Sequence, residues 1–183
     1  MRIIAGKYRS VRLASVGKGD AGAQLRPTSD RVRESLFNVL TSMDVIEDAI
    51  VMDLFAGTGA LGLEALSRGA CHLTCVDNGR VALRLLSENI EKLRARDATR
   101  VIKADARQLP PCDGPPATLV FMDPPYGRGL GSLALDAATT GGWLAKNATV
   151  VWEENAPVAA PEGFQLEDQR RYGDTYVTIL TKA

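Results

Sequence analysis

The 183-residue sequence predicts an α/β fold: a mostly parallel seven-stranded sheet with a C-terminal antiparallel hairpin and a small N-terminal hairpin extension. Three observations indicate this fold class. Apolar strand-like runs alternate with helical stretches between residues 49 and 154, which favours parallel strands joined by right-handed crossovers. A glycine-rich turn directly follows the first of these strands. Two strand-like runs joined by the short turn Gly173-Asp174 then close the chain as a hairpin.

The first 28 residues are expected to form the basic N-terminal hairpin extension, and residues 29–183 the main domain. Residues 3–13 read as a short strand or hairpin, and residues 18–24, which are rich in glycine, read as a loop. Residues 1–38 hold eight Lys or Arg against three Asp or Glu, whereas the remainder is acidic. The charge distribution therefore indicates a basic N-terminal portion attached to an acidic domain.

A helix is expected to begin within the stretch LRPTSDRVRESLFNVL, where Ser29 or Asp30 provides the N-cap. Arg31 and Arg33 are expected to lie off its buried face. The apolar side chains at helical spacing form that face: Val32, Leu36, Val39 and Leu40.

The alternating region justifies the sheet prediction element by element. Strands are expected over residues 49–55, 72–77, 100–105, 117–123 and 148–154, because each is a continuous or nearly continuous apolar run. Helices are expected over residues 59–69, 79–95 and 130–144. The closing hairpin comprises residues 164–172 and 175–182. With helices between successive parallel strands, the sheet is doubly wound.

The composition is that of a soluble globular protein, with 45% hydrophobic and 24% charged residues, and one main core is expected. No apolar run approaches the length of a membrane span, and the N-terminus lacks the apolar centre of a secretory signal. We therefore expect a cytoplasmic monomer with no membrane partner. Cys71, His72 and Cys75 are a poor set of metal ligands because His72 points to the opposite strand face, so no metal site is expected.

The glycine-rich turn has the spacing of a nucleotide-binding loop. Gly57, Gly59 and Gly62 follow a strand and open a helix, where backbone amides are available to an anionic group. Asp77 ends the next strand, twenty residues after Gly57, where an acid commonly holds ribose hydroxyls. This pattern suits any adenosine-type cofactor, and a merely structural tight turn remains an alternative.

Two cofactors compete for this loop: a nicotinamide dinucleotide and S-adenosylmethionine. The dinucleotide fold needs a second mononucleotide half, whereas this chain closes with a hairpin, which favours the methyl donor. Asp53 and Phe55 also fit the D-x-F-x-G-x-G form seen in methyltransferases. Asp105, after the third strand, is placed to accept a proton from an adenine amino group, although a helix cap explains it equally well.

The segment FMDPPYGRG forms a rigid corner after a buried strand, because its prolines hold Asp123 and Pro124 out of helical geometry. The Asp123 carboxylate and the Pro124 carbonyl are acceptors that would orient a nucleobase amino group toward a sulfonium methyl. Tyr126 would stack on the base, which must be unpaired or flipped out of a helix. The alternative is a proline-rich connection with a surface tyrosine.

At this point the chain resembles the RsmD-type methyltransferases over nearly its whole length. The resemblance is carried by RIIAGKYRS, LRPTSDRVRESLFN, DLFAGTGALGLEALSRGA, the MDPPY corner and RRYGDT. It implies a class I, Rossmann-like, S-adenosylmethionine-dependent enzyme that methylates the amino group of guanine 966 in 16S ribosomal RNA, within the small subunit or an assembly intermediate. Ser10 and Gly79 depart from the usual pattern, which has glycine at the first position and an acid at the second.

The resemblance also implies roles for individual residues. The catalytic corner comprises Asp123, Pro124, Pro125 and Tyr126. The expected cofactor residues are Asp53, Phe55, Ala56, Gly57, Gly59, Asp77, Asn78, Asp105 and Ala106. The basic residues expected to meet RNA phosphates are Arg2, Lys7, Arg9, Arg12, Arg26, Arg31 and Arg33, although a solvated face with helix ion pairs is the plainer interpretation of each.

Three other functions share some of these features. A DNA adenine methyltransferase would normally carry a recognition domain, for which this chain has no room. A protein glutamine methyltransferase would be expected to have Asn in place of Asp123. A non-enzymatic RNA-binding assembly factor differs from the predicted enzyme only in activity.

Overall fold

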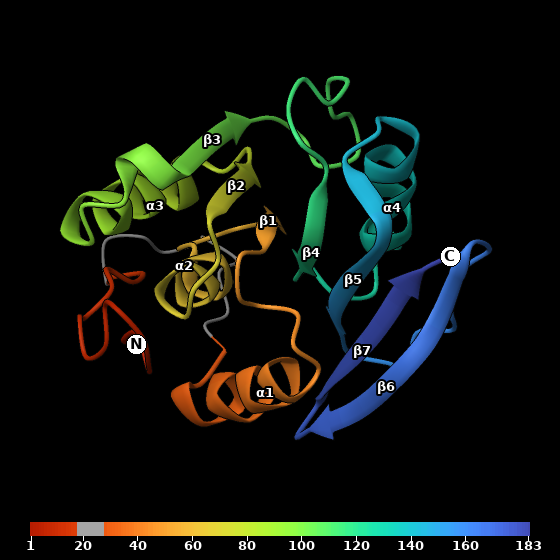
Figure 1. The fold of residues 1–183 in the computed structure, drawn as a ribbon, viewed down its shortest axis with the longest axis horizontal. Helices are drawn as coiled ribbons and strands as arrows, with labels where there is room; N and C mark the ends of the chain where they lie inside the picture. Colours follow the sequence, from red (N-terminus) through yellow and green to blue (C-terminus); the bar gives the residue numbers. More distant parts are fainter. Residues whose placement is uncertain (18–27) are drawn as a thin grey trace.

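A twisted seven-stranded sheet organises the chain, as Figure 1 shows for the computed structural model. The structure describes residues 1–17 and 28–183, so the expected loop at 18–24 and Arg26 lie outside the described residues. The strand order is β3-β2-β1-β4-β5-β7-β6. The strands are β1 (Ile50–Leu54), β2 (His72–Asp77), β3 (Thr99–Lys103), β4 (Ala117–Met122), β5 (Leu144–Glu154), β6 (Phe164–Tyr172) and β7 (Thr175–Lys182).

The pairing of these strands confirms the predicted fold class. The strands β1 to β5 pair in parallel, whereas β7 runs antiparallel to both β5 and β6. The strand order reverses between β1 and β4. Because these two strands are parallel, the chain leaves both of them at the same end of the sheet. Leu54 pairs with Met122, which brings the turn after β1 and the corner after β4 to adjacent strand ends. Ligands of open α/β sheets bind at such a switch point.

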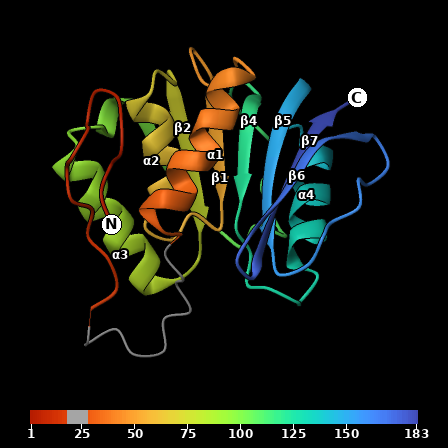
Figure 2. The same ribbon diagram turned by 90° about the horizontal axis from the view of Figure 1, so that it is seen from below.

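Helices cover both faces of the sheet, and Figure 2 shows α4 on the face away from α1 and α2. Apolar side chains of α1, α2 and α3 pack in one core cluster, and those of α4 pack in the other. The doubly wound arrangement is therefore confirmed. The helices are α1 (Asp30–Ser42), α2 (Ala60–Ser67), α3 (Arg80–Lys92), the short 3-10 helix η1 (Arg96–Ala98) and α4 (Leu130–Thr140).

The helix α1 begins where its sequence signal predicts. Ser29 is the N-cap, and its hydroxyl accepts a hydrogen bond from the amide of Val32 at 3.3 Å. The buried face contains Leu36, Phe37 and Leu40 and also Arg33. The buried stripe is thus rotated toward Phe37 and Arg33 relative to the expected one, while Val32 is only partly buried.

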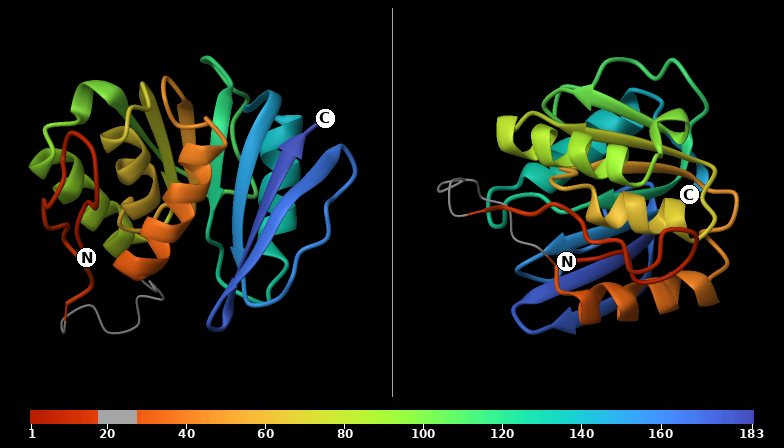
Figure 3. Two further views of the ribbon diagram at one scale, coloured as in Figure 1. Left: turned by 60° about the horizontal axis from the view of Figure 1, so that its bottom comes forward. Right: turned by 90° about the vertical axis from the view of Figure 1, so that its left-hand side faces the viewer.

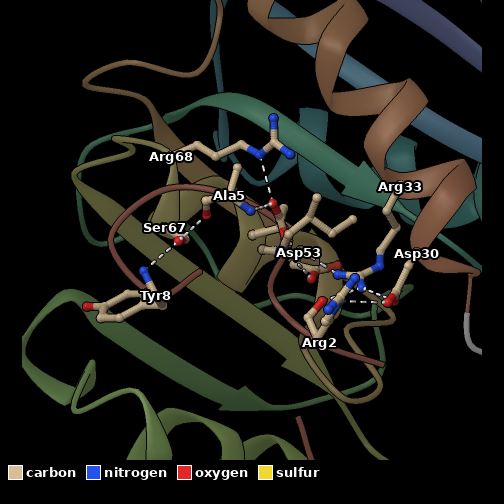
Figure 4. A network of polar contacts seen from close by, with 11 residues as sticks. Arg2, Ala5, Tyr8, Asp30, Arg33, Asp53, Ser67 and Arg68 are labelled. Atoms are coloured by element: carbon tan, nitrogen blue, oxygen red, sulfur yellow. Dashed lines mark hydrogen bonds and ion pairs between the residues drawn. The ribbon is translucent and has the colours of Figure 1, made fainter. Parts of the chain in front are cut away.

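Arg33 corrects a prediction, because its side chain is fully buried and does not face solvent. Its Nη2 donates to the carbonyl of Arg2 at 2.5 Å and to Asp30 Oδ1 at 2.7 Å. Its Nη1 lies 3.5 Å from Glu64 Oε2. Figure 4 shows this guanidinium between Arg2 and Asp30. Arg33 is therefore an internal cation that joins α1, α2 and the N-terminal segment, and the expectation that it meets RNA is wrong.

The N-terminal segment, residues 1–17, doubles back on itself with a single antiparallel bridge between Arg2 and Arg12. Two backbone hydrogen bonds close it, from the Ile3 amide to Val11 at 3.0 Å and from the Ser10 amide to Ile3 at 2.9 Å. Ser10 has φ 69°, a left-handed conformation that favours glycine. A glycine, which the resemblance to the RsmD-type family implies at this position, would adopt this conformation without strain.

The N-terminal segment lies against the helices on its face of the sheet, as Figure 3 shows. Lys7 donates its amide to the Ser67 carbonyl at 2.7 Å, and Tyr8 donates its amide to the Ser67 hydroxyl at 2.9 Å. The same hydroxyl donates to the carbonyl of Ala5 at 2.6 Å. Gly6, with φ 82°, permits this close approach of the segment to the end of α2.

In the part of the chain that the structure describes, no helix combines the length and the apolar character that crossing a membrane requires.

Replacing Gly6 by alanine should weaken the docking of the N-terminal segment, because the added Cβ would lie 1.8 Å from the Ser67 carbonyl oxygen. We expect the free energy of unfolding to fall by about 2–4 kcal/mol, from left-handed strain combined with overpacking. Gly163→Ala is the matched control, since Gly163 has φ 80° but no described atom within 4 Å of an added Cβ. Urea unfolding measures both variants, and equal losses would contradict the packing at Gly6.

Candidate active site

The glycine-rich turn follows β1 and adopts left-handed conformations at three positions. Phe55, Gly57 and Gly59 have φ values of 60°, 57° and 79°. Gly59 is the N-cap residue of α2 and has no side-chain hydrogen bond to offer the helix. The helix therefore starts with no capping side chain at its N-cap, so its first amides depend on acceptors from outside the helix.

Asp53 supports this turn from inside the protein. Its side chain is almost fully buried, and Oδ2 accepts a hydrogen bond from the Gly62 amide at 3.0 Å. Burial raises the pKa of Asp53 well above its usual range, and the charges of Asp123 and Asp77 raise it further. Asp53 therefore shapes the glycine-rich turn, and its electrostatic coupling to Asp123 and Asp77 marks one cluster of acids.

Asp77 ties the end of β2 to the same turn. Its Oδ2 accepts from the Gly57 amide at 2.9 Å, and its Oδ1 accepts from the Gly79 amide at 2.8 Å. The Ala56 amide donates to the Val76 carbonyl at 3.0 Å. Each carboxylate oxygen of Asp77 can accept a second hydrogen bond, so the group remains suited to hydroxyl donors. Asn78 follows Asp77 directly and lies at the same edge of the sheet.

Asn89 is a contributor that sequence reasoning missed. It is fully buried in α3, and its Nδ2 donates to the Thr58 carbonyl at 2.9 Å and to the Ala14 carbonyl at 3.2 Å. Its Oδ1 accepts from the Ala14 amide at 2.6 Å. The amide thus joins the N-terminal segment to the glycine-rich turn. The sequence did contain one signal for Asn89: it is a polar residue beside Leu86 and Ile90 on the apolar face of the expected helix.

Asp105 follows β3 and is paired with a neighbour. Its Oδ1 accepts from the Arg107 amide at 2.9 Å, and the Arg107 guanidinium binds the carboxylate in two places. The side-chain hydrogen bond from Arg107 lowers the pKa of Asp105 below its usual range. Residues 106–108 form only a turn, so Asp105 caps no helix, and Ala106 is buried beside it.

The Asp-Pro-Pro-Tyr corner follows β4 and is held from the end of β5. Glu154 Oε1 accepts from the Gly127 amide at 2.9 Å and from the Asn155 amide at 3.1 Å. Tyr126 lies partly buried with its hydroxyl 3.3 Å from Thr175 Oγ1. Burial, with a smaller contribution from Asp123, raises the pKa of Tyr126 to about 12. The tyrosine is therefore a neutral aromatic surface in a fixed place.

Tyr126 opens onto a pocket of about 500 Å³. This volume lies within the range of about 300–1,000 Å³ that is usual for small-molecule sites. The pocket is lined by Thr28, Ser29, Val32, Tyr126, Glu153, Asn155, Tyr172, Asp174 and Thr175. The end of the LRPTSD segment, at Thr28 and Ser29, and the RRYGDT segment thus form two of its walls. The sequence indicated both segments as distinctive but did not show that they meet.

The structure brings together the turn, the acid of β2 and the corner at one sheet edge. Arg2, Lys7, Arg9, Arg12 and Arg31 are exposed, and Arg2 Nε lies 3.5 Å from Asp30 Oδ2. Across residues 1–17 and 28–183, no group of three or more His, Cys, Asp or Glu side chains is placed to hold a metal ion.

Known proteins resemble this chain throughout. The family described as conserved hypothetical protein 95 matches residues 1–181. Ribosomal RNA small subunit methyltransferase D of Escherichia coli K12 is 39% identical over 176 residues, which cover 94% of this chain and 85% of that protein. The protein of that name from Haemophilus influenzae is 33% identical over 178 residues, covering 94% and 89%. The solved structure of yhhF from Escherichia coli has a TM-score of 0.83 at 35% identity and covers 100% of this chain and 97% of that one.

A parallel sheet with one reversed strand and an adenosine-type turn after β1 defines the class I S-adenosylmethionine-dependent methyltransferases, and this protein is one of them. The antiparallel closing hairpin, which stands in place of a second mononucleotide-binding half, fits the methyl donor rather than a dinucleotide. Within that class the chain belongs to the conserved hypothetical protein 95 family, and the resemblance to the RsmD-type enzymes is confirmed.

Asp77→Asn should weaken S-adenosylmethionine binding by about 10- to 100-fold, the equivalent of one charge-assisted hydrogen bond. The asparagine Nδ2 cannot accept, so either the Gly57 or the Gly79 amide loses its partner and the turn loosens. Isothermal titration calorimetry with the cofactor measures the change. Asp136→Asn, the same substitution at an exposed position of α4, is the control and should bind normally. Equal cofactor affinities in the two variants would contradict a role for Asp77 in cofactor binding.

Proposed function

We propose that this protein transfers a methyl group from S-adenosylmethionine to the exocyclic amino group of a guanine in 16S ribosomal RNA. The family resemblance implies guanine 966. The observation that carries the proposal is the pairing of Leu54 with Met122, since it sets the Asp123 corner beside the cofactor turn. The relatives named as small-subunit ribosomal RNA methyltransferases support the RNA class of the substrate.

The proposed chemistry uses the corner to orient a weak nucleophile. A guanine amino nitrogen is poorly nucleophilic because its lone pair is delocalised into the ring. The Asp123 carboxylate and the Pro124 carbonyl accept its two N–H groups and turn the lone pair toward the methyl donor. S-adenosylmethionine supplies the electrophilic sulfonium methyl. The nitrogen forms its bond to carbon as the carbon–sulfur bond breaks, and the proton then leaves to solvent.

Recognition of the base and of the RNA would use separate surfaces. Tyr126 offers its ring for stacking, worth on the order of 1–3 kcal/mol. The base must leave its helix or be unpaired to reach the pocket. The exposed basic residues of the proposed RNA surface are Arg2, Lys7, Arg9, Arg12 and Arg31. We propose that residues 1–28 act as an RNA-binding extension of a monomeric enzyme, with a small subunit or assembly intermediate as substrate.

Asp123→Ala should lower kcat by at least about 100-fold, a loss typical of removing one preorganised polar group from a transition state. Cofactor affinity should stay near the wild-type value, because Asp53 and Asp77, which accept hydrogen bonds from the Gly62 and Gly57 amides, are unchanged in this variant. Transfer of labelled methyl to small subunits from cells lacking the gene measures the rate, and mass spectrometry locates the modified nucleotide. Asp123→Asn keeps one acceptor oxygen and should retain intermediate activity. Full activity in Asp123→Ala would refute the assigned role.

Reversing charge at Arg9 and Arg12 should weaken RNA binding at least about tenfold and reduce its salt dependence, because two phosphate contacts are lost. Arg94→Glu with Lys146→Glu is the matched control. These residues carry the same charge change at exposed positions just after α3 and within β5. Filter binding across a salt series measures both double variants. If the two pairs weaken binding equally, the N-terminal segment has no special role in RNA contact.

A further inference from the structure

Glu153, the residue before the last of β5, has a carboxyl oxygen that the fold does not use. Its side chain is almost fully buried, and Thr28 Oγ1 donates to Oε2 at 3.3 Å. No residue in the described parts of the chain donates to Oε1. Buried polar atoms in native proteins nearly always have partners, and leaving one unpaired destabilises the fold. The unpaired oxygen therefore requires an explanation.

The position of Glu153 supplies one, because the residue lines the same pocket as Tyr126. Burial is the main reason that the pKa of Glu153 is raised to about 7, and the Asp53 charge adds to it. The bond to Thr28 opposes this increase. Holding the LRPTSD segment would need only the one oxygen that Thr28 contacts. The second oxygen is suited to a donor that enters the pocket.

Nucleobases differ in the group that lies beside their amino nitrogen. In guanine the amino group neighbours the N1–H donor. In adenine and cytosine the corresponding ring nitrogen is an acceptor with a lone pair. A carboxylate accepts from N1–H but repels a lone pair, and a site built to pair with one hydrogen-bonding group strongly rejects a base that lacks it. An acceptor beside the amino-group corner would therefore select guanine.

We propose that Glu153 is a specificity-determining residue whose Oε1 accepts the N1–H of the target guanine while Asp123 and Pro124 accept its amino group. The inference rests on the proposed function and deepens it. It also gives the LRPTSD segment a role, because Thr28 holds the other oxygen of Glu153 and so fixes the direction of the carboxylate. In this proposal the corner orients the amino group, and Glu153 selects guanine over bases that lack a donor beside that group.

The test compares guanine with 2-aminopurine at the target position of 16S RNA, ligated from segments and reconstituted into small subunits. 2-Aminopurine keeps the 2-amino group but presents a lone pair at N1. Glu153→Gln can donate to that lone pair through its amide. The ratio of kcat/KM for guanine over 2-aminopurine should therefore fall at least tenfold in Glu153→Gln. Comparing ratios between variants cancels the difference in intrinsic nucleophilicity of the two bases.

Two further measurements separate this role from a structural one. Urea unfolding of Glu153→Gln should show a midpoint at or above that of the wild type, because the substitution removes the cost of burying a charge that, within the described residues, has no cation beside it. Glu153→Asp keeps the charge and should keep the preference for guanine even where its rate is lower. It also carries the test if Glu153→Gln does not fold, and a lost preference in Glu153→Asp would overturn the inference.

The outcomes for the two proposals are distinct. Wild-type enzyme that fails to methylate guanine would refute the proposed function itself. Wild-type activity on guanine, with an unchanged base ratio in Glu153→Gln, would refute the role of Glu153 alone.

Discussion

The buried carboxylate of Glu64 is the constraint on which the architecture around the glycine-rich turn depends. It accepts from the Ile4 amide at 2.8 Å, from the Ala5 amide at 3.1 Å and from Arg68 Nε at 2.7 Å, with Arg33 close by. A charge without exposure is costly unless it is paired and hydrogen-bonded, and here two cations and two amides surround it. This network fixes α2 against α1 and the N-terminal segment. Since α2 begins directly after the glycine-rich turn, the turn is held in place with it.

Local sequence signals predicted most of the fold because they are short-range. The run HLTCVD matches β2 residue for residue, and Ser29 caps α1 as its residue type indicated. The prediction failed at Arg33, since an arginine off an apolar stripe is normally solvated. Its burial depends on Glu64, which is distant in the sequence and close only after folding. Helical periodicity contains no information about such a partner.

The same distinction divides the candidate site. Asp77 and the Asp123 corner could be placed in advance because Asp77 ends one buried strand and Asp123 directly follows another, and the carboxyl ends of parallel strands lie at the same end of the sheet. The opposite wall of the pocket combines Thr28 with Glu153, and only the sheet order and the packing of α1 bring them together. Asn89 is similar, because its partners Ala14 and Thr58 lie on separate segments. Neither the contact between Thr28 and Glu153 nor the contacts of Asn89 could be inferred from sequence spacing.

The docked N-terminal segment has a thermodynamic consequence. Releasing it would uncover Glu64 and remove acceptors from Arg33 and Asn89, so its ordering is coupled to the folding of the sheet and helices. The turn that carries Arg9 is therefore arranged before any ligand arrives. A partner that contacts it meets a preorganised backbone, and the entropy of ordering that backbone has already been lost during folding. Binding at that surface would still require the exposed arginine side chains to be ordered, but not the backbone that carries them.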